Sequence, residues 1–333
     1  MIIKRILILV TFTFSMFALF GQRGDTLKLI RFDGSLKTKL EYATETSKTR
    51  FSVRNSRMGV SGNPFKTISY RVQIELSNQG KFEVLDLSAT FEPLKNLTLT
   101  LGQTSIPLYN SYQTTPSQML FANRSFHVKY FVPGSRDIGF VANYAAQISG
   151  VLVDLEAGLY NASKINNPVW TEKLSWGVSA TAGSMDGFRA SAKLYRYPGM
   201  DRDFFVWGGD IRYGKERYKF EAEFLSRRNY FDNQVLNAAS VQGAYSIPLN
   251  NTEIFKDITP ALRWDVMGHA HNNNLLDASR LTAGLSFGFD TKPFSSLLRI
   301  DIEKYIVNRI LPELNIYDEM DSDKITLELL IIF

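Results

Sequence analysis

Basic side chains without nearby acids stand out in one stretch of this sequence. Arg124 and Lys129 lie between residues 104 and 135, Arg136 follows directly, and no acidic residue interrupts the stretch before Asp137. Arginines and lysines at the narrow point of a pore attract anions, because a low-dielectric wall strengthens their attraction for a partly dehydrated ion. The stretch therefore predicts anion binding if other elements carry it into a pore.

The histidines offer a different chemistry, which the sequence does not support. His127, His269 and His271 are the only imidazoles, and no Gly-x-Ser-x-Gly element accompanies them as a nucleophile. His269 and His271 alternate like two metal ligands on a strand, but an asparagine run follows them, which is typical of a solvated loop. We expect no enzyme, no catalytic residue, no cofactor, no metal site and no nucleic-acid partner.

The elements that must position the basic residues are short strands. Period-2 alternation of apolar and polar residues, separated by turn residues, predicts about 16 of them. Their expected ranges are 35–44, 50–61, 66–78, 81–92, 95–104, 136–146, 150–161, 173–183, 186–197, 203–214, 217–227, 234–247, 256–267, 279–289, 295–305 and 323–333. The connections after odd-numbered strands are mostly longer than those after even-numbered strands. This is the arrangement of a membrane barrel with long outer loops and short inner turns.

Each strand separates oily from charged side chains. In the stretch 66–78, Tyr70 and Val72 share one face while Arg71 and Gln73 share the other. A charge facing hydrocarbon costs about 2–4 kcal/mol at the bilayer midplane, so the polar face must point inward, toward water. A soluble β-sandwich would show the same alternation. The number of strands, the signal-like amino terminus and the aromatic-ended last strand favour an all-β fold, namely an antiparallel transmembrane β-barrel.

The amino terminus has the three parts of a secretory signal. Lys4 and Arg5 precede an apolar run from Ile6 to Phe20, which is shorter than the roughly 20 residues of a membrane-spanning helix. We predict a signal peptide over residues 1–22 and a barrel over residues 23–333. Removing the signal lowers the 38 Lys and Arg residues to 36 against 33 Asp and Glu, so net charge favours no particular partner. No cysteine is present, so neither disulfides nor thiolate metal sites are expected.

The last strand ends the chain on an aromatic residue. Ile325, Leu327, Leu329 and Ile331 share an apolar face that Phe333 completes. This strand resembles the closing strand of bacterial outer-membrane barrels, which their insertion machinery reads. We therefore expect a location in the bacterial outer membrane, contact with its lipid, and recognition by that machinery through Phe333.

Specific residues resemble the phosphate-selective porin O/P family. The run from Arg50 to Leu76 is similar to the early strand pair of that family, and later segments are similar to its Gly-Gln strand end and its third loop. The matching positions in the run are Arg54, Arg57, Gly59, Gly62, Tyr70, Arg71 and Gln73. The resemblance implies a porin, a passive ion and solute channel of sixteen strands, usually trimeric, with a constricting third loop. Acids such as Glu75, Asp210 and Asp301 on the expected inner faces depart from an anion-selective pattern.

Together these observations predict a diffusion channel for small hydrophilic solutes, with a preference for anions such as phosphate. The long third loop is expected to fold into the lumen. The expected constriction and anion-binding residues are Arg54, Arg71, Arg124, Lys129 and Arg136. Two alternatives remain open from sequence. The arginines could instead pin the loop to inward carboxylates such as Glu75, and the barrel could be a noncatalytic structural or adhesive protein with a closed lumen.

Overall fold

The computed structural model is one antiparallel β-sheet that closes on itself. It describes residues 30–53, 55–76, 80–107, 119–125, 131, 134, 136–163, 165–184, 186–199, 203–250, 253–270, 277–290, 295–309 and 322–333. The expected signal peptide lies outside the described residues. No helix in the described part is long and apolar enough to span a membrane.

Eighteen strand segments occur in the described residues. They are β1 (Arg31–Ala43), β2 (Lys48–Val53), β3 (Ser56–Phe65), β4 (Ile68–Leu76), β5 (Phe82–Leu94), β6 (Leu97–Ser105), β7 (Arg136–Ile148), β8 (Val151–Tyr160), β9 (Ser175–Gly183), β10 (Gly187–Pro198), β11 (Asp203–Lys215), β12 (Tyr218–Asn229), β13 (Val235–Tyr245), β14 (Ile247–Pro248), β15 (Asp257–His269), β16 (Ala278–Gly288), β17 (Leu297–Val307) and β18 (Lys324–Ile332).

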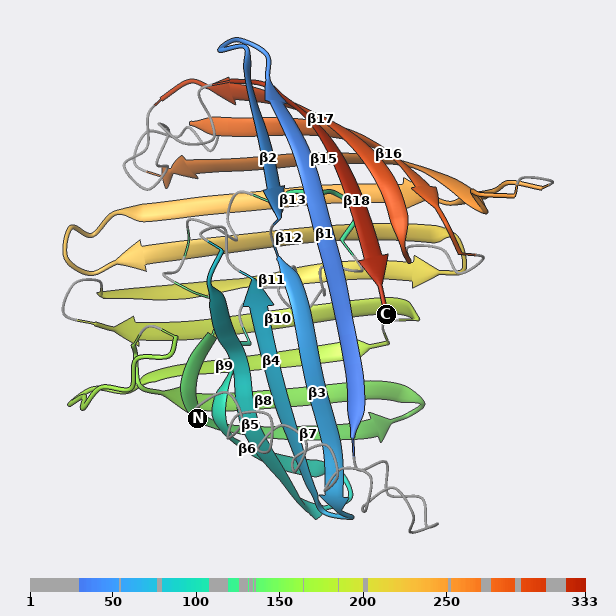
Figure 1. The fold of residues 1–333 in the computed structure, drawn as a ribbon. Coiled ribbons are helices and arrows are strands. Elements are labelled where there is room, and N and C mark those ends of the chain that lie inside the picture. Colours follow the sequence, from blue (N-terminus) through green and yellow to red (C-terminus); the bar gives the residue numbers. More distant parts are fainter. Residues whose placement is uncertain are drawn as a thin grey trace, which may run out of the picture.

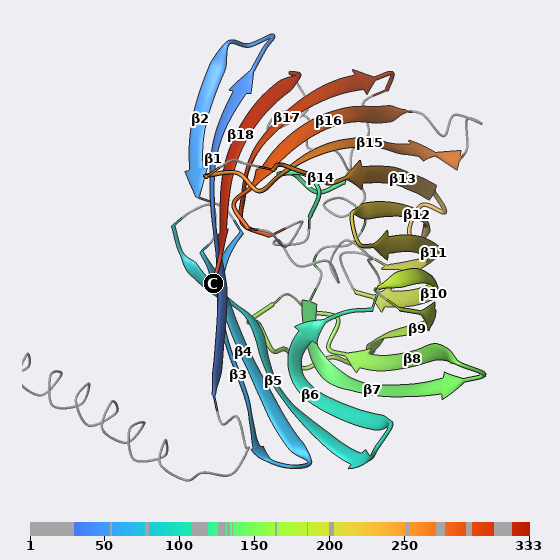
Figure 2. The ribbon, with the colours of Figure 1, turned by 90° about the vertical axis from the view of Figure 1, so that its right-hand side faces the viewer.

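These segments make sixteen barrel strands. Both β2 and β3 pair with β1, and both β13 and β14 pair with β15, so each of these two pairs is one interrupted strand. Every strand pairs with its neighbour in sequence, and β1 also pairs with β18, which closes the wall (Figures 1 and 2). The predicted sixteen-stranded antiparallel barrel is confirmed, and all sixteen predicted ranges overlap observed strands.

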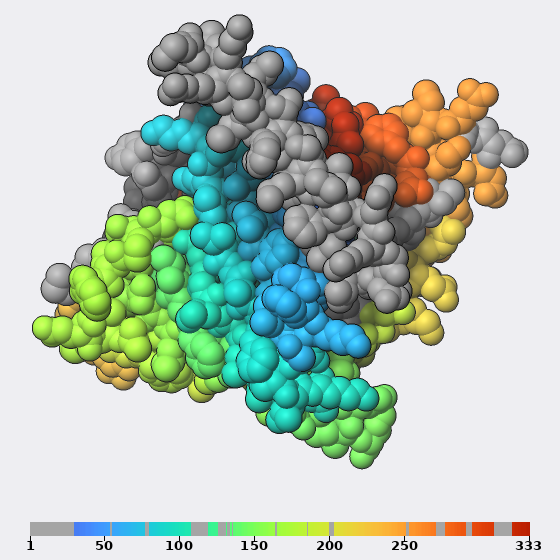
Figure 3. Space-filling view, turned by 60° about the horizontal axis from the view of Figure 1, so that its bottom comes forward, coloured from blue at the N-terminus to red at the C-terminus, as the bar shows by residue number. Residues whose placement is uncertain are grey.

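The two faces of each strand meet different surroundings, as predicted. On β17, Arg299 and Asp301 are fully buried toward the interior, whereas Ile300 and Ile302 are 39% and 56% exposed on the outside. Hydrocarbon offers no hydrogen-bond partners, so a β-sheet is stable in a bilayer only when it is closed and its outer face is apolar. In Figure 3, the blue, teal and green strands from β3 to β9 form one continuous outer surface on the near side.

The seam between the two ends of the barrel is closed by backbone hydrogen bonds. Phe333 and Gly34 exchange two of them, at 2.8 Å and 3.1 Å. The Phe333 ring lies over Gly34, where any side chain would come within 2.5 Å of it. A side chain there would also meet the Arg57 carbonyl oxygen at 2.9 Å, so this position of β1 favours glycine where the terminal aromatic residue closes the barrel.

Candidate functional site

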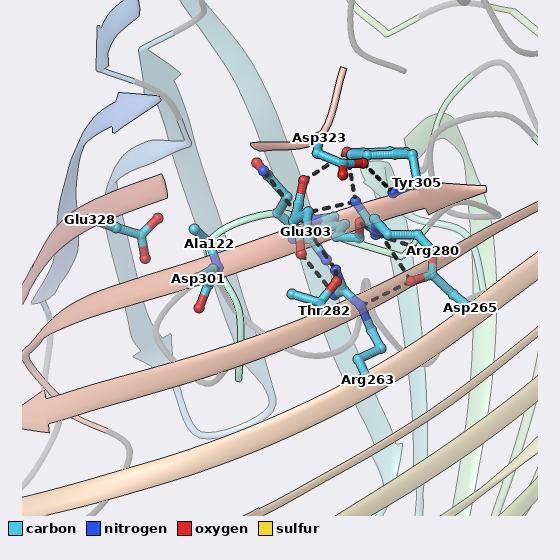
Figure 4. A network of polar contacts seen from close by, with 12 residues as sticks. Ala122, Arg263, Asp265, Arg280, Thr282, Asp301, Glu303, Tyr305, Asp323 and Glu328 are labelled. Carbon is cyan, nitrogen blue, oxygen red and sulfur yellow. Dashed lines mark hydrogen bonds and ion pairs between the residues drawn. The ribbon is translucent and has the colours of Figure 1, made fainter. Parts of the chain in front are cut away.

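The inner wall contains a dense network of ion pairs on β1, β15, β16, β17 and β18. We call this region the covered wall. Arg280 contacts Asp265 at 3.1 Å and Glu303 at 3.2 Å, and Arg263 contacts Asp265 at 3.1 Å (Figure 4). The side chains of these four residues are at most 4% exposed. Neighbouring strands place them side by side, because inward positions alternate in register across the sheet.

A second group of charges continues the covered wall toward the seam. Glu328 on β18 contacts Arg299 at 2.8 Å and Lys37 at 3.1 Å, and all three side chains are completely buried. Removing charges from water costs several kcal/mol per ion, and close pairing offsets that cost only when both partners are present. These groups therefore serve to hold the wall together and are not available to a passing solute.

Residues 119–125 of the third loop cover this wall. The Ala122 amide donates to Asp301 at 2.7 Å, and the Asn123 side chain donates to Glu303 at 3.2 Å. In the other direction, wall cations donate to loop carbonyls: Lys39 to Ala122 at 2.8 Å, Arg263 to Asn123 at 2.8 Å, Arg280 to Arg124 at 2.6 Å and Arg299 to Met119 at 2.8 Å. This segment therefore lies inside the barrel, against β1 and β15 to β17.

An apolar cluster contacts the loop near the barrel end that carries the long connections. Phe131 is completely buried among inward side chains such as Tyr195, Val206 and Leu225. Arg227 donates to the Phe131 carbonyl at 2.9 Å and lies over its ring. The described parts of the loop are thus fixed at two places, one ionic and one apolar.

In contrast to the covered wall, the inner charges on β3, β4, β5, β7 and the start of β1 are partly exposed to the lumen. We call this region the open wall. Arg57 pairs with Glu75 at 2.6 Å, Arg136 pairs with Asp86 at 2.7 Å, and Arg71 pairs with Asp33. The side chains of Arg71 and Asp33 are 29% and 44% exposed. Water reaches these charges, so their field acts on solutes in the lumen while salt partly screens it.

The structure separates the residues that the sequence singled out. Arg71 and Arg136 lie on the open wall, whereas Arg124 belongs to the segment on the covered wall. Arg54 and Lys129 lie outside the described residues, as do His127 and His271. Glu75 pairs with Arg57 on the neighbouring strand, and Arg136, at the exit of the loop, pairs with the inward carboxylate Asp86. In residues 119–125 the contacts run both ways, because loop N–H groups donate to Asp301 and Glu303 while wall cations donate to loop carbonyls.

Several important inward residues were missed in the sequence. Lys37, Lys39, Arg263, Arg280 and Arg299 form the covered wall, yet none was among the expected site residues. Their alternation with apolar residues shows that they face inward. Nothing in their own strands indicates that residues 119–125 bury them, because these contacts join residues 83 to 180 positions apart in sequence.

A closed sixteen-stranded barrel with an apolar outside, a charged inside and an inserted loop defines the class of outer-membrane channels. A family model for the phosphate-selective porins O and P matches residues 31–198. The chain therefore belongs to the phosphate-selective porin O and P family. It is an outer-membrane porin, a diffusion channel. Porins are not enzymes, so the family confirms that expectation.

Solved porins share this fold at low sequence identity. OmpF of Salmonella typhi matches with a TM-score of 0.64 and 12% identity over 91% of this chain and 97% of that chain. The anion-selective porin of Comamonas acidovorans gives 0.60 and 11% over 91% and 99%. The trimer form of OmpT of Vibrio cholerae gives 0.60 and 9% over 91% and 99%. No curated protein sequence matches the chain.

Proposed function

We propose that this porin passes small hydrophilic solutes with a modest preference for anions such as phosphate. The observation that supports the proposal is the position of Arg71 and Arg136 on the open wall, where their side chains are 29% and 10% exposed. Arg54, Arg124 and Lys129 complete the proposed anion-binding set. Each guanidinium group of the open wall keeps a carboxylate partner, and this limits its net field. The ratio of anion to cation permeability is therefore small, and it falls as salt screens the charges of the wall.

Three further proposals concern the protein as it is made and assembled. Residues 1–22 act as a secretory signal that is removed, which leaves residues 23–333 as the barrel. The mature barrels assemble as a homotrimer, and OmpT of Vibrio cholerae, which shares the fold, has been solved in a trimer form. Insertion into the membrane uses the exposed terminal Phe333. Intact mass and native mass spectrometry of protein purified from the outer membrane test the first two points.

Reversal potentials in planar bilayers under a KCl gradient test the anion preference. The wild type is expected to favour chloride, and the variants Arg71→Gln, Arg136→Gln and Arg124→Ala are expected to reduce that preference. Arg212→Gln is the matched control, because Arg212 pairs with Glu221 on another part of the wall at 3% side-chain exposure. A wild type without anion preference, or variants that keep it unchanged, would overturn the proposal.

A further inference from the structure

Two carboxylates on the inner face of β8 differ from the other inward acids. Asp154 and Glu156 are two residues apart on one strand, so both face the lumen. Register places Asn143 of β7 opposite Glu156, Ser179 of β9 opposite Glu156, and Thr181 of β9 opposite Asp154. Oxygen-bearing side chains of three neighbouring strands therefore surround the two acids.

This acid pair has no basic partner among the described residues. Asn143 Nδ2 donates to Asp154 Oδ1 at 2.8 Å, and Asn143 lies directly opposite Glu156 in the strand register. Both acids therefore lie beside the same amide group on one face of the sheet. Inward acids of the open wall, such as Glu75 and Asp86, have an arginine at 2.6–2.7 Å. Two adjacent carboxylates without a cation repel each other, and a bound cation removes that repulsion.

A buried hydroxyl directed toward this pair gives an independent indication of a ligand. Tyr160 is completely buried, and its hydroxyl has no hydrogen-bond partner in the described structure. The hydroxyl lies over Gly158, in the space that a side chain there would fill. Gly158 separates Tyr160 from Glu156 on the same face, so the ring extends along β8 toward Glu156. A buried hydroxyl without a partner costs about 1–3 kcal/mol, which a ligand or its water would recover.

We propose that Asp154 and Glu156 form a binding site for a hydrated divalent cation such as Ca²⁺ or Mg²⁺. Hard cations take carboxylate, amide carbonyl and water oxygens, and all three are available at this position. The Asn143 amide turns to present its oxygen to the cation, and the Tyr160 hydroxyl donates to a Glu156 oxygen or accepts from a cation-bound water. The described residues hold no group of three or more His, Cys, Asp or Glu placed for a metal, so water completes the coordination.

The site has a consequence for conduction. A bound divalent cation neutralises the two negative charges of the acid pair on the lumen wall. The electric field in the lumen then becomes more favourable for anions. This holds whether the channel without the cation prefers anions or cations. This inference goes beyond the proposed anion preference and does not depend on it, because binding is measured directly as well as through conduction.

Terbium luminescence tests binding directly, since Tb³⁺ replaces Ca²⁺ and is excited through nearby tyrosines. Purified barrel in detergent is expected to give a sensitised signal that Ca²⁺ competes away at about 0.1–1 mM, the range of weak calcium sites. The Asp154→Asn, Glu156→Gln double variant is expected to lose the signal. Tyr160→Phe keeps the ring and loses the hydroxyl, so several-fold weaker Ca²⁺ competition is expected.

Glu83→Gln is the matched control, because Glu83 is an exposed acid on β5 that lies opposite Glu75 of β4. In bilayers, Ca²⁺ is expected to shift the wild-type and Glu83→Gln reversal potentials toward anions and to leave the double variant unchanged. If the double variant does not fold, the single variants Asp154→Asn and Glu156→Gln replace it in the test. Each of them is expected to weaken binding. A Ca²⁺-competed signal that survives in the folded variants, or no competed signal in the wild type, would overturn the site.

Discussion

The covered wall and the open wall carry the same kinds of charge in opposite surroundings. On the covered wall, Arg299 and Glu328 are wholly buried beneath the loop, whereas Arg71 and Asp33 on the open wall reach the lumen. Removing one partner of a buried ion pair is strongly destabilising, because the other charge is left buried without compensation. An exposed pair contributes little to stability, but its electric field extends into the water of the lumen. The difference shows that inward charge alone does not identify a permeation site.

The largest expected effect is on the covered wall. Arg299→Met leaves the completely buried Glu328 without its guanidinium partner, so we expect a loss of about 3–5 kcal/mol in unfolding free energy. Urea unfolding in lipid vesicles, followed by tryptophan fluorescence, measures this loss. Lys304→Met is the control, because the Lys304 side chain is 63% exposed and pairs with Asp323 at the barrel rim. Equal losses in the two variants would remove the distinction between buried and exposed charge.

The attachment of the loop segment is expected to give an intermediate effect. Asn123→Ala removes the contacts to Lys39 and Glu303, which costs about 1–3 kcal/mol of local stability. Hydrogen exchange at residues 119–125 is expected to accelerate, and the single-channel current to become noisier. Asn96→Ala, in the turn between β5 and β6, should change neither. Unchanged exchange in Asn123→Ala would mean that backbone contacts alone hold the segment.

The open wall is expected to respond in conduction rather than in stability. Arg71→Gln should change the unfolding free energy by less than about 1 kcal/mol, because water surrounds this pair. The same variant should lower the ratio of anion to cation permeability. Both quantities are to be measured on one protein preparation. A stability loss as large as that of Arg299→Met would contradict the assignment of Arg71 to a hydrated wall.

The smallest expected effect lies at the rim of the seam. The Ser322 hydroxyl, with Thr44, lowers the pKa of Glu45 from 4.5 to about 2. A lowered pKa stabilises the folded state above pH 4.5, and this contribution is lost as the pH falls toward 2. The difference in unfolding midpoint between wild type and Glu45→Gln should therefore shrink over that interval. A Glu45→Gln difference that stays constant over this interval would contradict the contact.

The family resemblance and the strand pattern were enough to predict most of the fold. The sixteen strands and the class of channel follow from features that each segment carries in itself. The candidate site was predicted less completely. Arg71 and Arg136 face the lumen as expected, but they are paired, and Arg124 lies with the segment on the covered wall. The acid pair of β8 stood in an expected strand, yet only its neighbours reveal that it has no basic partner in the described part of the barrel.

The sequence by itself determined the period-2 alternation, and with it the barrel, its lipid-facing side and its inward charges. Alternation is local, because side chains two residues apart on a strand always share a face. Only the tertiary structure decided which inward charges are buried and which meet water. That division depends on contacts such as the one between Ala122 and Asp301, which lie 179 residues apart. Whether a charge is buried depends on what covers it, and the covering segment comes from elsewhere in the chain.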